Sequence, residues 1–151
     1  TPSYFKDIHK YHQIIHETDL ANNFGMYYKK YKTKLSKYMQ TAIAKGNKHS
    51  AKEYAEAIDF KKRSYESYQE VFEDYHGVLT PSSPGVALKG LKNTGTAEFN
   101  KVWSYLGTPC ISLPLLEGEN NLPLGIQLIG DRYDDHRFLG VANWLEKECN
   151  N

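Results

Sequence analysis

The first half of the chain has the hydrophobic spacing of amphipathic helices. Apolar side chains recur every three to four residues over 8–15 and again over 27–42. Residues 21–25, Ala-Asn-Asn-Phe-Gly, interrupt this spacing, so we expect two helices with a break at that point. The second of these helices is expected to end at Gly46, because glycine commonly follows the C-terminus of a helix.

A third helix is predicted to begin at Ser50 and to end before Gly77. Ser50 and Glu53 have the spacing of a capping box, in which each side chain binds a free backbone N–H at the helix start. Large apolar side chains then share one predicted face: Tyr54, Ile58, Tyr65, Tyr68, Phe72 and Tyr75. This face is expected to be buried.

The hydrophobic period changes after Gly77 to that of strands. Short apolar runs at 78–80, 110–116 and 124–130 predict three strands, and the polar turn at 117–121 favours an antiparallel pair. The Pro-Ser-Ser-Pro-Gly segment at 81–85 predicts an irregular turn, because proline constrains its neighbours and lacks a backbone donor.

Two shorter helices complete the predicted elements. Thr96 is a candidate cap for the first, and Asp134 or Asp135 for the second. The predicted fold is therefore α/β, with long N-terminal helices packed on a small mixed sheet. We interpret residues 1–151 as a single domain or fragment with a helical part, 1–76, and a mixed strand and helix part, 77–151.

Composition and charge exclude several classes of function. The formal net charge is +1, which provides no field for nucleic acid or an anionic membrane. No apolar run approaches the roughly 20 residues that a membrane helix needs. We therefore predict no nucleic-acid partner and no membrane partner. The two cysteines, Cys110 and Cys149, fit a reducing cytoplasm better than a disulfide-stabilised secreted protein.

Two local clusters are better explained as ordinary helix surfaces than as binding sites. His9, His12 and His16 have helical spacing and could bind a transition metal, but nothing nearby completes such a site. The lysine and tyrosine run at 27–34 has the composition of single-strand binders, yet a helix directs its aromatic and basic side chains apart. We predict no metal and no cofactor.

A series of short motifs in the second half resembles the C-terminal end of the amidase-signature family. A strand followed by Thr-Pro comes first, then a Thr-Gly pair, Phe-Asn before a helix, Leu-Gly-x-Pro, Pro-x-Gly-x-Gln and an acidic pair. Here they are Thr80-Pro81, Thr94-Gly95, Phe99-Asn100, Leu106-Gly107-Thr108-Pro109, Pro123-Leu124-Gly125-Ile126-Gln127 and Asp134-Asp135. Their order and spacing together make the match specific.

The resemblance implies hydrolysis of carboxamide C–N bonds by a serine nucleophile. In this family a second serine, on a cis peptide bond, relays the proton to a lysine base, and backbone N–H groups stabilise the oxyanion. We find none of these catalytic residues in the chain and expect them upstream. Ser82 and Ser83, with Lys89 close behind, occupy the Thr-Pro loop of the family and lack its glycine-rich flanks, so we interpret them as turn residues.

The resemblance also implies that this segment lines the substrate pocket. Thr94, Gly95, Phe99 and Trp103 are the candidate pocket residues, although Phe99 and Trp103 could instead be core residues on one helix face. A common variant of the family has aspartate directly after Thr-Gly, where this chain has Thr96. Gln127 lies in a predicted strand and is expected to have a structural role.

The implied function is that of the C-terminal segment of a cytoplasmic amidase. Its partners would be a small-molecule amide substrate and either the missing N-terminal catalytic part or a second copy in a homo-oligomer. Two alternatives remain open. One is the glutaminase-type subunit of a tRNA-dependent amidotransferase, although residues 96–103 resemble general amidases more closely. The other is a catalytically inactive stand-alone interaction domain.

Overall fold

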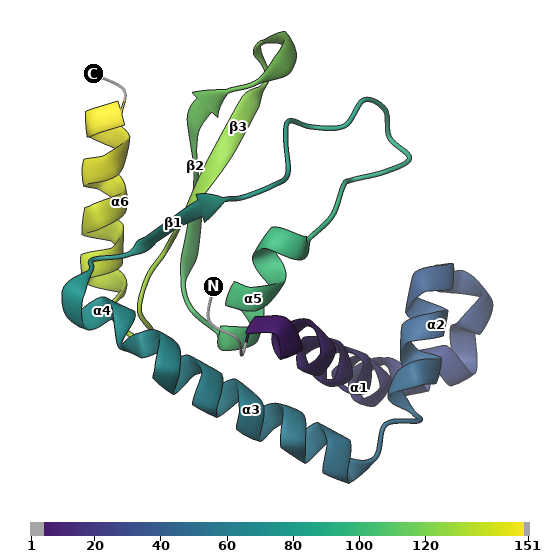
Figure 1. The fold of residues 1–151 in the computed structure, drawn as a ribbon. Coiled ribbons are helices and arrows are strands. Elements are labelled where there is room, and N and C mark those ends of the chain that lie inside the picture. Colours follow the sequence, from purple (N-terminus) through teal and green to yellow (C-terminus); the bar gives the residue numbers. More distant parts are fainter. Residues whose placement is uncertain (1–4, 150–151) are drawn as a thin grey trace. The chain divides into compact units, whose positions relative to one another are not determined.

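The computed structural model describes residues 5–149, with helices and a three-stranded sheet, and confirms the α/β class (Figure 1). The chain divides into two compact units, residues 1–64 and residues 65–151. Each unit has its own buried residues and is described by itself. Among the described residues, no helix has the length and apolar character needed to cross a bilayer.

The first unit contains α1 (Phe5–Tyr31), α2 (Lys37–Gly46) and the first turns of α3 (Ala51–Gln69). The predicted break at residues 21–25 is wrong, because α1 continues through Gly25 and the break lies at residues 32–36. A single glycine costs a helix only about 1 kcal/mol. Ser36, in contrast, starts a new helix, since its Oγ accepts a hydrogen bond from the Met39 N–H at 3.2 Å.

Helices α1 and α2 pack closely at Gly46, the residue at which α2 was predicted to end. This predicted end is confirmed. Gly46 is the last residue of α2, and the Asn47 N–H donates to the Ile43 carbonyl at 3.1 Å. Gly46 is buried against the backbone of Glu17 and the methyl group of Ala21 in α1. Glycine therefore serves this site mainly by letting two helices approach each other.

The capping box that starts α3 is confirmed. The Ser50 Oγ accepts from the Glu53 N–H at 3.2 Å, and the Glu53 carboxylate accepts from the Ser50 N–H at 2.7 Å. The predicted buried face is only partly correct. Tyr68 is buried, but Ile58 is 42% exposed, whereas the small residue Ala57 is fully buried. A pattern of large apolar residues does not reveal that a small side chain occupies the buried position.

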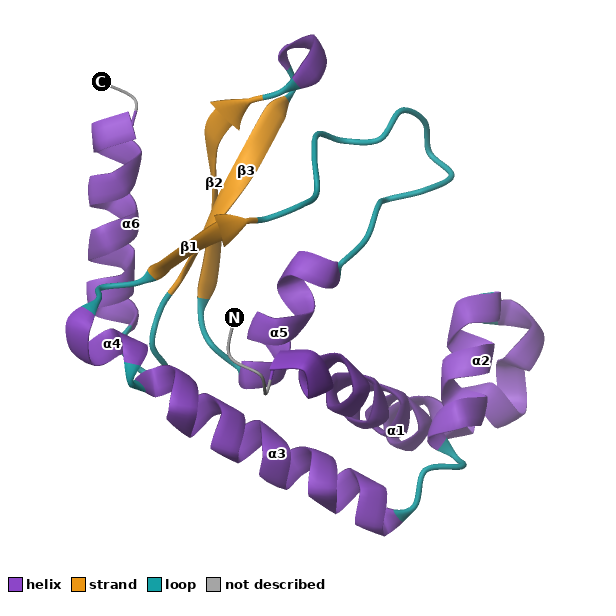
Figure 2. Ribbon diagram, viewed as in Figure 1, coloured by secondary structure: helices purple, strands orange, loops and turns teal. Residues whose placement is uncertain are grey.

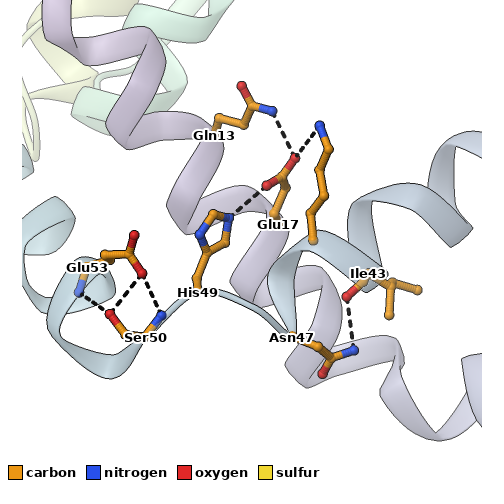
Figure 3. Close-up of polar contacts among 8 residues, drawn as sticks. Gln13, Glu17, Ile43, Asn47, His49, Ser50 and Glu53 are labelled. Atoms are coloured by element: carbon orange, nitrogen blue, oxygen red, sulfur yellow. Dashed lines mark hydrogen bonds and ion pairs between the residues drawn. The ribbon is translucent and has the colours of Figure 1, made fainter.

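The acidic side chain of Glu17 is buried at the centre of a polar cluster in the first unit (Figure 3). Its two oxygens accept hydrogen bonds from Gln13 Nε2 at 2.9 Å and His49 Nε2 at 2.8 Å, and Lys45 Nζ lies 3.7 Å away. Burial would raise the pKa of Glu17, but these partners together lower it below its ordinary value. The cluster joins α1 to the connection between α2 and α3.

We expect this cluster to make the protein sensitive to acid. A carboxylate with a lowered folded-state pKa adds stability above its unfolded pKa of about 4.5, and that stability is lost as the pH falls through the folded-state value. Glu17→Gln should reduce the free energy of unfolding by about 1–3 kcal/mol at pH 7 and by less at pH 3. Urea titrations at both pH values measure this difference.

The matched control for this prediction is Glu56→Gln. Glu56 is 3.8 Å from Lys52 on an exposed helix surface, so its replacement should change stability by less than about 0.5 kcal/mol. An equal effect of Glu17→Gln at the two pH values would contradict the proposed role of the charge.

The second unit contains α4 (Val71–Asp74), β1 (Val78–Pro81), α5 (Glu98–Leu106), β2 (Cys110–Glu117), β3 (Pro123–Ile129) and α6 (Asp135–Cys149). The strand order is β1-β3-β2, and both pairs of described strands are antiparallel. The β2–β3 hairpin is thus confirmed, but the expected mixed sheet is wrong. Strands β1 and β2 run in the same direction, yet β3 lies between them and prevents a parallel pair.

The alternation of side chains gives the sheet two different faces. Leu128 lies opposite Ile111 and packs with Phe138 and Ala142 of α6 in an apolar cluster. Gln127 lies opposite Ser112, and these residues point to the other face, towards α5. Figure 2 shows α6 and α5 on opposite sides of the strands. One face is therefore core, and the other carries polar side chains.

Candidate functional site

A hollow of about 500 Å³ lies between α5 and the polar face of the sheet. Its lining comes from the turn after β1, from α5 and the loop that follows it, and from β2 and β3. The lining residues are Ser82, Asn100, Trp103, Ser104, Thr108, Cys110, Ser112 and Gln127. The hollow lies entirely within the second unit.

The turn after β1 approaches the sheet closely because residue 125 is glycine. A Cβ at Gly125 would lie 2.4 Å from the Ser82 Oγ and 2.7 Å from the Ser112 Oγ. The Gly125 carbonyl accepts hydrogen bonds from both the N–H and the hydroxyl of Ser82, at 3.1 and 2.8 Å. These contacts form the rigid turn that the sequence predicts at residues 81–85.

Gln127 holds the two sides of the hollow together. Its side chain is buried, and its Nε2 donates to the carbonyls of Pro81 at 3.0 Å and Phe99 at 2.9 Å. The Asn100 Nδ2 makes a weaker contact of 3.4 Å with the Ser82 carbonyl. One amide group thus joins β3 to the end of β1 and to the first turn of α5. This bears out the structural role expected for Gln127.

Trp103 takes part in both the core and the hollow. Its indole is 9% exposed, and its ring centroid lies 5.4 Å from that of Tyr68. It also belongs to the lining of the hollow. The two interpretations of Trp103 from the sequence, pocket wall and core, are therefore compatible. Truncation of this side chain would affect packing as well as any bound ligand.

The other predicted pocket residues lie outside the lining. Thr94 and Gly95 are exposed in the loop between β1 and α5, where Gly95 has a φ of +87°. The ring of Phe99 is 37% exposed, and only its carbonyl contributes, as an acceptor for Gln127. Thr96 helps to start α5, because its Oγ1 accepts from the Glu98 N–H at 3.2 Å.

The lining of the hollow contains no carboxylate, amine, guanidinium or imidazole. Burial raises the pKa of the Cys110 thiol, so this group is neutral near pH 7. The Ser82 hydroxyl donates its proton to a backbone carbonyl rather than to a base. The hollow can therefore form hydrogen bonds and contact an indole, but its own side chains include no general base for a serine nucleophile.

Two of the three histidines that the sequence singles out in α1, His12 and His16, make contacts within the first unit. The rings of His12 and His16 stack with centroids 5.9 Å apart, and the His16 Nε2 lies 3.1 Å from the Tyr38 hydroxyl. Within residues 5–149, no group of three or more His, Cys, Asp or Glu side chains is placed to hold a metal ion. Both cysteines are free thiols.

Several lining residues were not predicted as pocket residues from the sequence. Ser112 and Gln127 are polar positions between apolar neighbours in predicted strands. Cys110 lies two residues before Ser112 and therefore points to the same face of the sheet. This alternation was a usable signal for a polar sheet face. The contribution of Ser104 and Thr108 depends on where α5 packs, which the sequence pattern does not give.

Comparisons with known proteins agree with this description of the fold. A solved structure described as an amidase superimposes on 93% of this chain with a TM-score of 0.80 at 19% identity, covering 35% of that chain. The structure of a 6-aminohexanoate cyclic dimer hydrolase superimposes on 99% of this chain with a TM-score of 0.70 at 15% identity. The superimposed part is 35% of the hydrolase chain. The fold of this chain is thus found within both of these solved structures.

Sequence comparison leads to the same family. A glutamyl-tRNA(Gln) amidotransferase subunit from Alkaliphilus metalliredigens is 35% identical over 102 residues, which are 63% of this chain and 21% of that protein. The chain therefore spans about a fifth of the length of this curated relative. The sequence profile of the amidase family matches residues 3–139. With nearly its whole length matched, this chain belongs to the amidase family.

Proposed function

We propose that this chain is the C-terminal part of a hydrolase that cleaves carboxamide C–N bonds. The family match over residues 3–139 is the main support for amide chemistry. The C-terminal position is supported by the motif series after Gly77 and by the small share, 21%, of the relative's length that the chain covers. The free thiols of Cys110 and Cys149 fit the cytoplasmic location that we propose.

In this proposal the chain forms one wall of the substrate site and the rest of the protein performs the chemistry. The resemblance implies a serine nucleophile, a second serine on a cis peptide bond and a lysine base, all outside residues 1–151. The uncharged hollow supports this division, because its serines lie beside no base. The wall would orient the amide so that the nucleophile attacks its carbonyl carbon, and an acyl-enzyme would follow.

Trapping of the acyl group tests this function. The complete protein that contains this chain, given butyramide and hydroxylamine, should release ammonia and form the hydroxamate of butyric acid, because hydroxylamine intercepts an acyl-enzyme. The 151-residue chain alone should produce neither compound. Ammonia and hydroxamate are both measured by colorimetric assay.

Ser83→Ala provides the control for the serine assignment. The Ser83 hydroxyl donates to the Gly85 carbonyl at 2.6 Å and does not line the hollow, so the variant should keep hydroxamate formation. The proposal would fail if the complete protein formed no hydroxamate from a panel of simple amides, or if the isolated chain turned them over. The former result would favour the inactive interaction domain.

A second candidate function is that of the glutaminase-type subunit in a tRNA-dependent amidotransferase. The observation that favours it is the 35% identity to the glutamyl-tRNA(Gln) amidotransferase subunit from Alkaliphilus metalliredigens. This function requires glutamine as the amide donor, whereas a general amidase accepts simple carboxamides. Ammonia release from glutamine and from butyramide by the complete protein therefore separates the two.

A further inference from the structure

The chemistry of the hollow restricts the kind of amide that can occupy it. Its eight lining residues provide hydroxyls, side-chain amides, a thiol and an indole, and none of them carries a charge near neutral pH. Hydroxyls and amides can both donate and accept hydrogen bonds. Such a lining satisfies neutral polar groups and offers no counter-charge to an ion.

Gln127 adds an acceptor to this lining. Its amide nitrogen uses two hydrogens on the carbonyls of Pro81 and Phe99, as described above. Its Oε1 accepts no hydrogen bond from the residues that the structure describes. Because the nitrogen is committed to these two carbonyls, the oxygen is the atom of this lining side chain that remains to accept a donor from a ligand. The N–H of a carboxamide is a donor of this kind.

Two charged residues, Asp131 and Arg132, follow β3 and lie outside the lining, and the Arg132 Nε is buried without a hydrogen-bond partner among the described residues. The Asp131 Oδ1 accepts from the Tyr65 hydroxyl at 2.5 Å and from the Arg132 N–H at 2.8 Å. The Arg132 guanidinium lies 3.6 Å from the centroid of the Tyr65 ring and close to Gly107. Of these groups, the Arg132 guanidinium lies beside Gly107, which precedes the lining residue Thr108, but none of them belongs to the lining.

We propose that the hollow receives an uncharged part of a carboxamide substrate, so that the protein discriminates against amides of free α-amino acids such as glutamine. An α-ammonium or α-carboxylate placed here would lose its hydration without gaining a partner of opposite charge from this lining, which is strongly unfavourable. A neutral amide would lose only hydrogen bonds that the lining replaces. This inference rests on the proposed function of amide hydrolysis.

Substrate competition tests the proposal in the complete protein. The ratio kcat/KM for butyramide should exceed that for glutamine by about 100-fold or more, because a site without charged partners rejects a charged analogue. The two amides share the reacting group and differ at the far end of the molecule. Comparable values for the two amides, or a preference for glutamine, would overturn the proposal.

A charge introduced into the lining tests whether the hollow itself causes the preference for uncharged amides. Ser104 is exposed on α5 and faces the hollow, so Ser104→Asp should lower kcat/KM for butyramide by about tenfold and raise the relative rate for 4-aminobutyramide, a cation. Ser67→Asp is the matched control, because Ser67 is exposed on α3 and lies outside the lining. Equal effects of the two variants, or unchanged ratios in Ser104→Asp, would overturn the proposal.

A binding measurement separates this inference from the proposed hydrolysis. In the complete protein, the part of the tryptophan fluorescence response that is lost in a Trp103→Phe variant reports on the hollow, because Trp103 belongs to its lining. Butyramide should produce a saturable change, and glutamine should produce none at the same concentration. This result without any turnover would reject the hydrolase and keep the neutral site, whereas a response to glutamine alone would reject the neutral site.

Discussion

Gly46→Ala is expected to reduce the free energy of unfolding by about 3 kcal/mol or more, which is at the upper end of the usual cost of overpacking. An added Cβ at Gly46 would lie 1.9 Å from the carbonyl oxygen of Glu17 and 2.9 Å from the Ala21 Cβ. The closest of these atoms is backbone, so it cannot move aside as the end of a side chain does. Helices α1 and α2 would have to separate.

Two opposing effects decide the sign of this change. Alanine is a better helix former than glycine by about 1 kcal/mol in a helix interior, and this advantage is smaller at Gly46, the last residue of α2. The steric conflict is larger, because the buried helix contact would be lost with it. Glu17 belongs to the polar cluster with His49, so separation of the helices would also lengthen those hydrogen bonds.

Gly25→Ala is the matched control for Gly46→Ala. Gly25 lies within α1, and no atom is within 4 Å of the position that its Cβ would take. The same substitution should therefore stabilise the protein by up to about 1 kcal/mol. Urea titrations followed by circular dichroism measure both variants. Similar stability changes in the two variants would show that the α1–α2 contact is looser than described.

Gln127→Met is the second change for which we expect a large effect. Methionine has a similar size but no donor, so the carbonyls of Pro81 and Phe99 would each lose a hydrogen bond. A typical hydrogen bond contributes about 0.5–1.5 kcal/mol, and we expect a total loss of about 1–3 kcal/mol for the two. The turn after β1 and the start of α5 would no longer be held together.

Thermal unfolding and urea titrations measure the effect of Gln127→Met. Gln69→Met is the control, because Gln69 is exposed at the end of α3 and its replacement should change stability by less than about 0.5 kcal/mol. Gln127→Glu should be at least as harmful as Gln127→Met, since a carboxylate cannot donate to either carbonyl. A stability within about 0.5 kcal/mol of the parent for both variants at position 127 would contradict the role that we assign to it.

Local signals in the sequence were sufficient for much of the secondary structure. The Ser50–Glu53 capping box and the end of α2 at Gly46 depend on neighbouring residues alone. The β2–β3 hairpin likewise follows from two apolar runs joined by a polar turn. The motif series also indicated the family, which the match over residues 3–139 bears out. Each of these features involves residues close together in the chain, so a short stretch of sequence contains all of its partners.

Features that depend on distant residues were not predictable in this way. The continuation of α1 through Gly25 was missed, since one glycine is too weak a signal to break a helix. The position of β3 between β1 and β2 depends on pairing between residues far apart in the chain, such as Leu79 and Leu128. The alternation of polar and apolar residues along a strand does not predict which strands will be neighbours in the sheet.

The hollow shows the same division most clearly. Gln127 could be assigned a structural role from its position in a strand, but its two acceptors lie 46 and 28 residues away. Ser82, Ser104 and Ser112 look unremarkable in separate segments, and they form one uncharged lining only when α5 packs on the polar face of the sheet. The sequence therefore determined which residue types each segment contributes. Only the tertiary structure decided that they line one site, because contacts between residues far apart in the chain depend on how the elements pack and not on local sequence.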